Sequence, residues 1–292
     1  MPGKANRERY GPVTDQDANP GRLPTDVPER AREPLSFDTG VAHPARIYDY
    51  WLGGKDNYQA DRDVAEQAVA ANPNILPGVR ANRAFLRRAV QYLAGEAGIR
   101  QFLDIGTGLP TADNTHEVAQ QIAPESRIVY VDNDPIVLAH ARALLTSTPE
   151  GATAYIQADA RDPGRILAEA AQKLDLSQPV AVMFLMTLQY IPDSDGPHEI
   201  VSRVMGAMAP GSYLAISDTT SDIDTQRVSS TTAQLNTQMG GTRLNLRSRE
   251  EISRYFAGLD LVEPGLVPMP QWRAPADSAH TIPCYAGVGR KP

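Results

Sequence analysis

Three aspartates and two glycines stand where predicted β-strands end, and these residue types together can bind a polar ligand. They are Asp104, Gly106 and Gly108 in FLDIGTG (102–108), Asp132 in VYVDND (129–134) and Asp159 in QADARD (157–162). The carboxyl ends of parallel strands meet at one edge of an open α/β sheet, and such sheets bind ligands at that edge. The sequence therefore predicts one binding site lined by carboxylates and flexible backbone.

Each carboxylate suits a different part of a ligand that contains a nucleoside. Asp104 would repel a pyrophosphate and attract a cationic amino-acid group. Asp132, at the end of the next strand, is placed to accept hydrogen bonds from ribose hydroxyls. Asp159 would accept a hydrogen bond from an exocyclic adenine amine, with the Ala160 backbone N–H facing a ring nitrogen. The structural alternatives are a plain turn for the glycines and a solvated or capping role for the aspartates.

From Gln101 onward, apolar runs alternate with segments that begin at helix-capping residues. The predicted strands are 102–105, 127–131, 153–157, 179–186, 213–217, 259–263 and 283–289. The predicted helices are 61–71, 79–94, 114–123, 134–146, 162–174, 197–208 and 248–258. Alternation of strands and helices predicts a doubly wound α/β fold with three layers.

Composition limits the classes of protein that this chain can be. The chain has 292 residues, 41% of them hydrophobic, and a formal net charge of −7, which disfavours broad binding to a phosphate backbone. Cys284 is the single cysteine, so a cysteine cage for a metal is implausible and no metal is expected. The sequence has no apolar run near the length of a membrane span and no apolar signal core at its start. We expect a soluble cytoplasmic protein that binds neither nucleic acid nor membrane.

Local composition divides the chain into three parts. Residues 1–38 are polar and rich in proline and charge, which predicts a disordered tail. Residues 39–95 are expected to form a helical cap or lid, with aromatic side chains concentrated in 46–58 around a Gly53-Gly54 turn. Residues 96–292 form the predicted α/β domain, with a polar insertion at about 219–246.

With these motifs in order, the chain resembles the class I S-adenosylmethionine-dependent methyltransferases. It resembles more closely an actinobacterial S-adenosyl methyltransferase family formerly described as a domain of unknown function. That likeness is carried by ARIYDYWLGGKDNY, RANRAFLRRAV, QFLDIGTGLPT, VYVDNDP and the closing YAGVGRK. It implies a Rossmann-like three-layer sandwich with a seven-stranded, mostly parallel sheet and an antiparallel last strand. Pro110 stands where the general pattern has a third glycine, which should stiffen the turn.

The resemblance implies S-adenosyl-L-methionine as the cofactor and a methyl acceptor that it does not name. The residues expected around the cofactor are Tyr48, Asp104, Gly106, Thr107, Gly108, Asp132, Asn133, Asp159, Ala160, Leu185 and Met186. Gln189 and Tyr190 are weak candidates for polar groups that face the acceptor, and Tyr190 is equally well explained as a core residue. Arg46 and Lys55 are further candidates for the cofactor carboxylate, with a surface role as the alternative.

Histidines and one further aspartate give weaker signals. His116 and His140 fall inside predicted helices and suit packing or surface positions, whereas His43, His198 and His280 lie near loops where a general base would be possible. Asp218, at the end of the fifth strand, suits either the acceptor or a cap of the next loop.

The function that best fits these patterns is methyl transfer to an O, N or C nucleophile of a small molecule. One alternative is a regulatory protein that binds S-adenosylmethionine without catalysis, since no dedicated base is evident. Another is a nicotinamide-dependent oxidoreductase, which Asp104 and the absence of G-x-G-x-x-G disfavour. The oligomeric state is left open.

Overall fold

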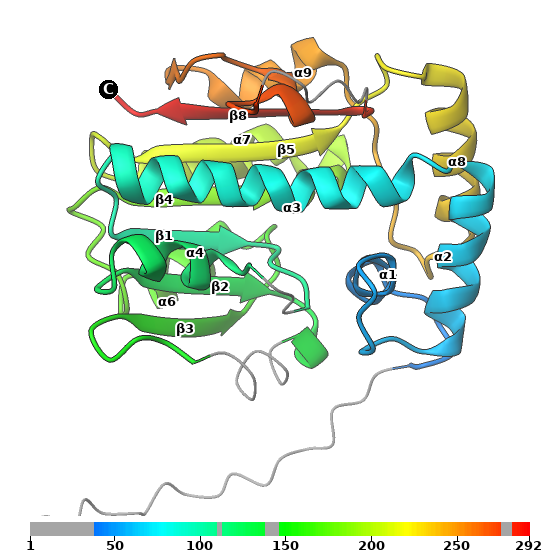
Figure 1. Ribbon diagram of the computed structural model, residues 1–292, viewed down its shortest axis with the longest axis horizontal. Helices are drawn as coiled ribbons and strands as arrows, with labels where there is room; N and C mark the ends of the chain where they lie inside the picture. Colours follow the sequence, from blue (N-terminus) through cyan, green and yellow to red (C-terminus); the bar gives the residue numbers. More distant parts are fainter. Residues whose placement is uncertain (1–37, 110–112, 138–145, 276–281) are drawn as a thin grey trace, which may run out of the picture. The chain divides into compact units, whose positions relative to one another are not determined.

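The computed structural model describes residues 38–109, 113–137, 146–275 and 282–292, and its centre is a single mixed sheet (Figure 1). The sheet order is β3-β2-β1-β4-β5-β8-β6, with β7 also paired to β8. The strands are β1 (Gln101–Ile105), β2 (Arg127–Asp132), β3 (Ala152–Gln157), β4 (Ala181–Leu185), β5 (Tyr213–Thr219), β6 (Asp260–Leu261), β7 (Val267–Pro268) and β8 (Cys284–Arg290). Of the predicted disordered tail, all but Asp38 lies outside the described residues.

Strand direction confirms the expected mostly parallel sheet with an antiparallel last strand. Strands β1 to β5 pair in parallel, and β8 runs antiparallel to β5 over seven residue pairs. An eighth strand appears because the outer neighbour of β8 is interrupted. Strand β6 pairs with the end of β8 near Gly289, and β7 pairs nearer its start at Ala286.

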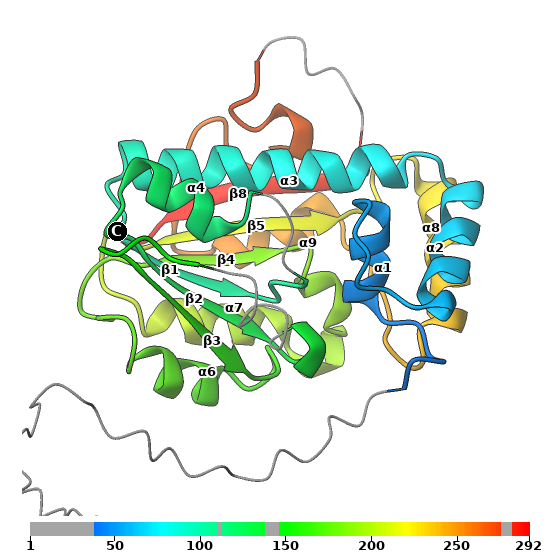
Figure 2. The ribbon, with the colours of Figure 1, turned by 60° about the horizontal axis from the view of Figure 1, so that its bottom comes forward.

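Helices cover both faces of the sheet (Figure 2). On one face lie α3 (Ile75–Gln91), which continues into a π-helical turn at Tyr92–Glu96, and α4 (Thr115–Ile122). On the other lie α6 (Pro163–Ala170), α7 (Pro197–Gly206) and α9 (Arg249–Ser253). Side chains alternate between the two resulting cores along β1, with Phe102 in the core under α3 and Leu103 and Ile105 in the core under α6 and α7.

Local capping signals place several helix starts where the sequence predicts them. Capping boxes at Asn114 and at Ser248 begin α4 and α9, and the Asp162 side chain accepts a hydrogen bond from the Arg165 backbone N–H at the start of α6. The helix predicted from Asp134 begins at Pro135, and the Asp134 carboxylate accepts from the Ile136 N–H at 2.8 Å. Residues 138–145 of that predicted helix lie outside the described residues.

A helical cap lies beyond the carboxyl ends of the parallel strands, on the right in Figures 1 and 2. It consists of α1 (Pro44–Trp51), α2 (Gln59–Ala71) and α8 (Thr225–Gln238). Its own apolar cluster joins Ile47 of α1 and Val64 of α2 to Leu235 of α8. The polar insertion at 219–246 thus packs on the aromatic N-terminal segment.

Candidate active site

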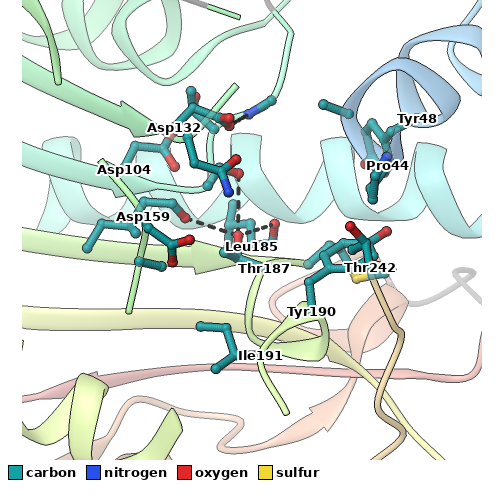
Figure 3. A pocket seen from close by; sticks show the side chains of 18 of the residues that line it. Pro44, Tyr48, Asp104, Asp132, Asp159, Leu185, Thr187, Tyr190, Ile191 and Thr242 are labelled. Carbon is teal, nitrogen blue, oxygen red and sulfur yellow. Dashed lines mark hydrogen bonds between the residues drawn. The ribbon is translucent and has the colours of Figure 1, made fainter. Parts of the chain in front are cut away.

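A cavity of about 440 Å³ lies between the carboxyl ends of the strands and the cap. That volume is within the usual range for sites that bind small molecules and cofactors. The predicted cofactor residues line it together: Tyr48, Asp104, Gly106, Thr107, Gly108, Asp132, Asn133, Asp159, Ala160, Leu185 and Met186. Figure 3 shows Asp104, Asp132 and Asp159 gathered at one side of this pocket and Tyr48 and Tyr190 at the other.

Both glycines of the turn after β1 are required, and the structure gives a reason for each of them. Gly106 has φ +76° and lies so close to Thr187 that an added Cβ would be 2.8 Å from the Thr187 Cβ. Gly108 has φ +66°, and within the described residues no neighbour lies within 4 Å of such an atom. The turn is fixed from two sides, because the Gly106 N–H donates to the Val131 carbonyl at 2.8 Å and the Gly108 N–H donates to the Asp132 carboxylate at 2.8 Å.

Burial raises the pKa of two of the aspartates toward neutral pH. Asp132 accepts hydrogen bonds from the backbone N–H groups of Gly108 and Asp134, and its burial raises its pKa to about 6. Asp104 accepts from the Thr115 hydroxyl at 2.7 Å, and burial likewise raises its pKa to about 6, opposed by the charge of Arg83. Both carboxylates are therefore ionised at pH 7 but protonate readily in mild acid.

Asp159 differs from the other two because it is already paired. The Arg161 guanidinium donates to both of its carboxylate oxygens, at 2.9 and 2.6 Å, and also reaches Asp195 at 3.2 Å. These hydrogen bonds hold the pKa of Asp159 below its usual range. Its side chain is about a third exposed, which leaves the carboxylate accessible from the cavity.

A chain of hydrogen bonds ties the aromatic end of the pocket to the sheet. The Tyr48 hydroxyl donates to the Val79 carbonyl at 3.3 Å and accepts from the Asn82 amide at 2.9 Å. The Ser217 hydroxyl donates to Asn82 at 2.7 Å, and the Met186 N–H donates to Ser217. Met186 has φ +57°, a conformation that ordinary residues adopt only when their surroundings impose it. The network thus sets both Tyr48 and the backbone after β4.

The loop that follows β4 is held by a buried arginine from the insertion. Arg247 is almost completely buried and donates to the carbonyls of Leu188 at 2.9 Å and Ile191 at 2.7 Å, on either side of Tyr190. It also pairs with Asp193 at 2.8 Å, and its Nη1 lies 3.6 Å from the buried carboxylate of Asp218. This residue therefore fixes the position of the loop that carries Tyr190 into the pocket.

Comparison with known proteins identifies the family of this fold and pocket. A family model described as S-adenosyl methyltransferase matches residues 30–292. The chain belongs to the S-adenosyl methyltransferase family. A crystal structure of a DUF574 family protein from Streptomyces avermitilis is 46% identical, with a TM-score of 0.84 over 87% of this chain and 99% of that one. A second structure, from Thermobifida fusca, is 40% identical, with a TM-score of 0.81 over 89% of this chain and 99% of that one. No curated protein matches the chain.

Membership of this family makes the protein an S-adenosylmethionine-dependent methyltransferase, and the pocket fits that cofactor chemically. Buried carboxylates suit a ligand that has hydroxyl and ammonium donors and no phosphate. The family assignment therefore takes the place of the alternative function, a nicotinamide-dependent oxidoreductase. Within the described residues, no three or more His, Cys, Asp or Glu side chains are grouped to hold a metal ion. No helix in the same part of the chain is long and apolar enough to cross a membrane.

The methyltransferase is expected to bind S-adenosylhomocysteine more tightly as the pH rises from about 5 to about 7.5. We expect Asp104 and Asp132, each with a pKa raised to about 6, to bind the ligand's donors most strongly when charged, so binding below pH 7 should release protons. The stability of the ligand-free protein should change in the opposite sense. These raised pKa values contribute stability at low pH that is lost as the pH rises from about 4 to about 6. Calorimetry in two buffers of different ionisation enthalpy measures the protons, and an affinity that is flat across this range would contradict the expectation.

Several predicted residues do not lie in the pocket of this methyltransferase. Gln189 is buried behind the wall, where its side chain oxygen accepts hydrogen bonds from the hydroxyl and the N–H of Thr219. Arg46 is buried in an ion pair with Asp61 at 2.9 Å, and Lys55 is exposed and does not line the cavity. Asp218 is completely buried beside Arg247, so neither of its two predicted roles describes it fully. Lys55 thus takes the surface role that was its alternative, whereas Gln189, Arg46 and Asp218 are buried by segments that are distant in the sequence.

The described histidines lie in three different environments. His116 packs in the core, with its ring Nδ1 2.8 Å from the Tyr130 hydroxyl. His198 stacks on Tyr255, and His43, the N-cap of α1, lines the pocket. His140 and His280 lie outside the described residues, as does Pro110.

Two residues at the pocket were not predicted from the sequence. Asn82 lines the pocket, and Arg247 holds the loop beside it. Asn82 belongs to RANRAFLRRAV, one of the motifs that carry the family likeness. In a helix, Asn82 lies three residues before the buried Phe85 and therefore on the same face. Arg247 had no such signal, because an arginine in a polar stretch is usually solvated.

Proposed function

We propose that this protein transfers a methyl group to an O, N or C nucleophile of a small molecule bound at the aromatic end of the pocket. The observation that carries the proposal is the division of one cavity into an end with three aspartates and an end with two tyrosines. The acidic end suits the adenosyl and amino-acid parts of the cofactor. The remaining space, under the cap, is then the place for the acceptor.

The cofactor-binding roles follow from the donors and acceptors at the acidic end. Asp132 would accept hydrogen bonds from the ribose hydroxyls, Asp104 would face the amino group, and Asp159 with Ala160 would recognise the adenine. The Arg83 guanidinium also lines the pocket, donates to the Asp113 carbonyl at 2.8 Å and acts on Asp104 electrostatically. It is therefore a better candidate for the cofactor carboxylate than Arg46 or Lys55.

When bound, S-adenosylmethionine would supply an activated methyl group, carried on a positively charged sulfur. The chain's own contribution is to align the acceptor and to exclude water. Tyr48, Tyr190 and Met186 would do both, since they line the pocket from the cap and from the loop after β4.

Removal of an acceptor proton does not fall to the tyrosines. Burial raises the pKa of Tyr48 and of Tyr190 to about 12, so both hydroxyls stay neutral at pH 7. His43 can take a proton there, because burial lowers its pKa and keeps the ring neutral. Its Nδ1 lies 3.2 Å from the buried carboxylate of Asp134, which would stabilise the imidazolium once formed.

Asp132→Ala should weaken binding of S-adenosylhomocysteine by about 1–3 kcal/mol, because it removes charged hydrogen bonds to the ligand and one that shapes the glycine turn. Titration calorimetry with S-adenosylhomocysteine and NAD side by side measures the effect and the choice of cofactor. Asp260→Ala, on the exposed edge strand β6, is the matched control and should bind as the wild type does. Unchanged affinity in Asp132→Ala would remove this residue from the site, and preference for NAD would refute the proposal.

A further inference from the structure

The side chains at the acceptor end of the pocket limit the class of molecule that can be the methyl acceptor. This inference rests on the proposed function above. Figure 3 shows Pro44 and Tyr48 of α1 on one side and Tyr190 and Thr242 on the other, away from the three aspartates. The loop Gly240–Arg243, which follows α8, forms part of this wall. The acceptor end is thus made by the cap and by the loop after β4.

The walls of this end offer ring and hydrocarbon surface more than hydrogen bonds. The Tyr48 hydroxyl is already bonded to Val79 and Asn82, and the Tyr190 hydroxyl lies beside the Gln189 side chain. Ile191 and Pro192 continue the apolar surface next to Tyr190. Two tyrosine rings that face a common space favour a flat ligand, since aromatic rings pack well in stacked or edge-to-face arrangements.

Among the described residues, the lining of this end includes an arginine and no carboxylate. All carboxylates that line the cavity in the described part of the chain belong to the acidic end: Asp104, Asp132 and Asp159. Of the arginines that line it, Arg161 is paired with two aspartates and Arg83 lies near Asp104. Arg243, next to Thr242, makes no ion pair with any described residue. In a chain of net charge −7, an unpaired arginine at the pocket wall attracts an anionic ligand.

We propose that the methyl acceptor is a flat aromatic molecule with an anionic group, a carboxylate or a phosphate. Its ring packs between Tyr48 and Tyr190, and its anionic group pairs with Arg243. Arginine suits this role because its planar guanidinium can donate two parallel hydrogen bonds to either group. The neutral hydroxyls of both tyrosines place no negative charge against the anion.

The test measures binding of four probes to the full-length protein saturated with S-adenosylhomocysteine. The probes are 4-hydroxybenzoate, its neutral analogue 4-hydroxybenzamide, phenyl phosphate and the non-aromatic cyclohexanecarboxylate. We expect 4-hydroxybenzoate or phenyl phosphate to bind at least about tenfold more tightly than the amide, the gain of one charged pair. The one that binds better identifies the anionic group, and cyclohexanecarboxylate should bind about tenfold more weakly than 4-hydroxybenzoate.

Variants at Arg243 separate this proposal from a general effect on the pocket. Arg243→Gln should remove the preference for the anion over the amide and leave the affinity for S-adenosylhomocysteine unchanged, while Arg243→Lys should retain part of the preference. Arg254→Gln changes an exposed arginine that pairs with Glu250 and does not line the pocket, and this variant should bind all probes as the wild type does. If the wild type binds S-adenosylhomocysteine but neither anion, or binds them no better than the amide, this proposal is wrong. Failure to bind S-adenosylhomocysteine would instead overturn the proposed function.

Discussion

Replacement of Arg247 by methionine should lower the free energy of unfolding by about 3–5 kcal/mol, because it leaves a buried carboxylate without its counter-charge. The guanidinium holds two loop carbonyls and lies 3.6 Å from Asp218, whose pKa is raised to about 7 by burial. Without Arg247 that pKa should rise further. The loss of stability should therefore be larger at about pH 8 than at about pH 5, where Asp218 is neutral in both proteins.

Chemical denaturation at both pH values measures this effect. Arg254→Met is the control, because Arg254 is exposed and its ion pair is an i,i+4 pair with the exposed Glu250, so its replacement should change stability by less than about 0.5 kcal/mol. Adding Asp218→Asn to Arg247→Met should recover part of the loss, since the unpaired charge is then absent. An equal loss at both pH values would show that Asp218 and Arg247 are not coupled.

Gly106→Ala should lower the free energy of unfolding by about 2–5 kcal/mol, and most of that cost should come from a collision and not from the glycine conformation itself. A left-handed backbone with a Cβ costs about 1–2 kcal/mol, and forcing atoms into a packed site costs about 1–3 kcal/mol more. The added atom would meet the Cβ, Cγ2 and Oγ1 atoms of Thr187, which holds the ends of β1 and β4 together through a hydrogen bond to the Ile105 carbonyl at 3.0 Å.

Gly108→Ala is the matched control within the same turn. Its φ is also positive, but no atom of the residues that the structure describes lies within 4 Å of the added Cβ, so its cost in stability should stay at about 1–2 kcal/mol. Because Gly108 lines the cavity, this variant should instead weaken binding of S-adenosylhomocysteine. Denaturation and calorimetry on both variants give the comparison, and equal stability losses would show that contact with Thr187 is unimportant.

These two sites show how the pocket depends on segments that are distant in the sequence. Thr187 and Gly106 come from neighbouring strands of the sheet, whereas Arg247 reaches the same loop from the insertion. Asn245 strengthens that attachment, because its N–H donates to the Gln189 carbonyl at 2.7 Å. The aromatic end of the pocket is therefore assembled by the insertion as much as by the sheet.

Local sequence was sufficient for the sheet and for the acidic end of the pocket. Apolar runs, and caps such as Asn114 with Glu117 or Asp162 before Pro163, act over three or four residues, so their physical meaning can be read from neighbours alone. Once strands alternate with helices, parallel pairing brings Asp104, Asp132 and Asp159 to one edge.

The shape of the aromatic end of the pocket was decided by tertiary structure. The polar residues of α8 have weak periodicity, and only their packing against Ile47 and Val64 makes the cap a closed unit. Likewise, Arg247 looks like a solvated residue until the fold surrounds it with carbonyls and carboxylates. Burial of a charged group depends on which distant groups come to satisfy it, and a sequence window cannot contain them. The sequence by itself thus determined which carboxylates meet at the edge of the sheet, and the folded chain determined what shapes the space beside them.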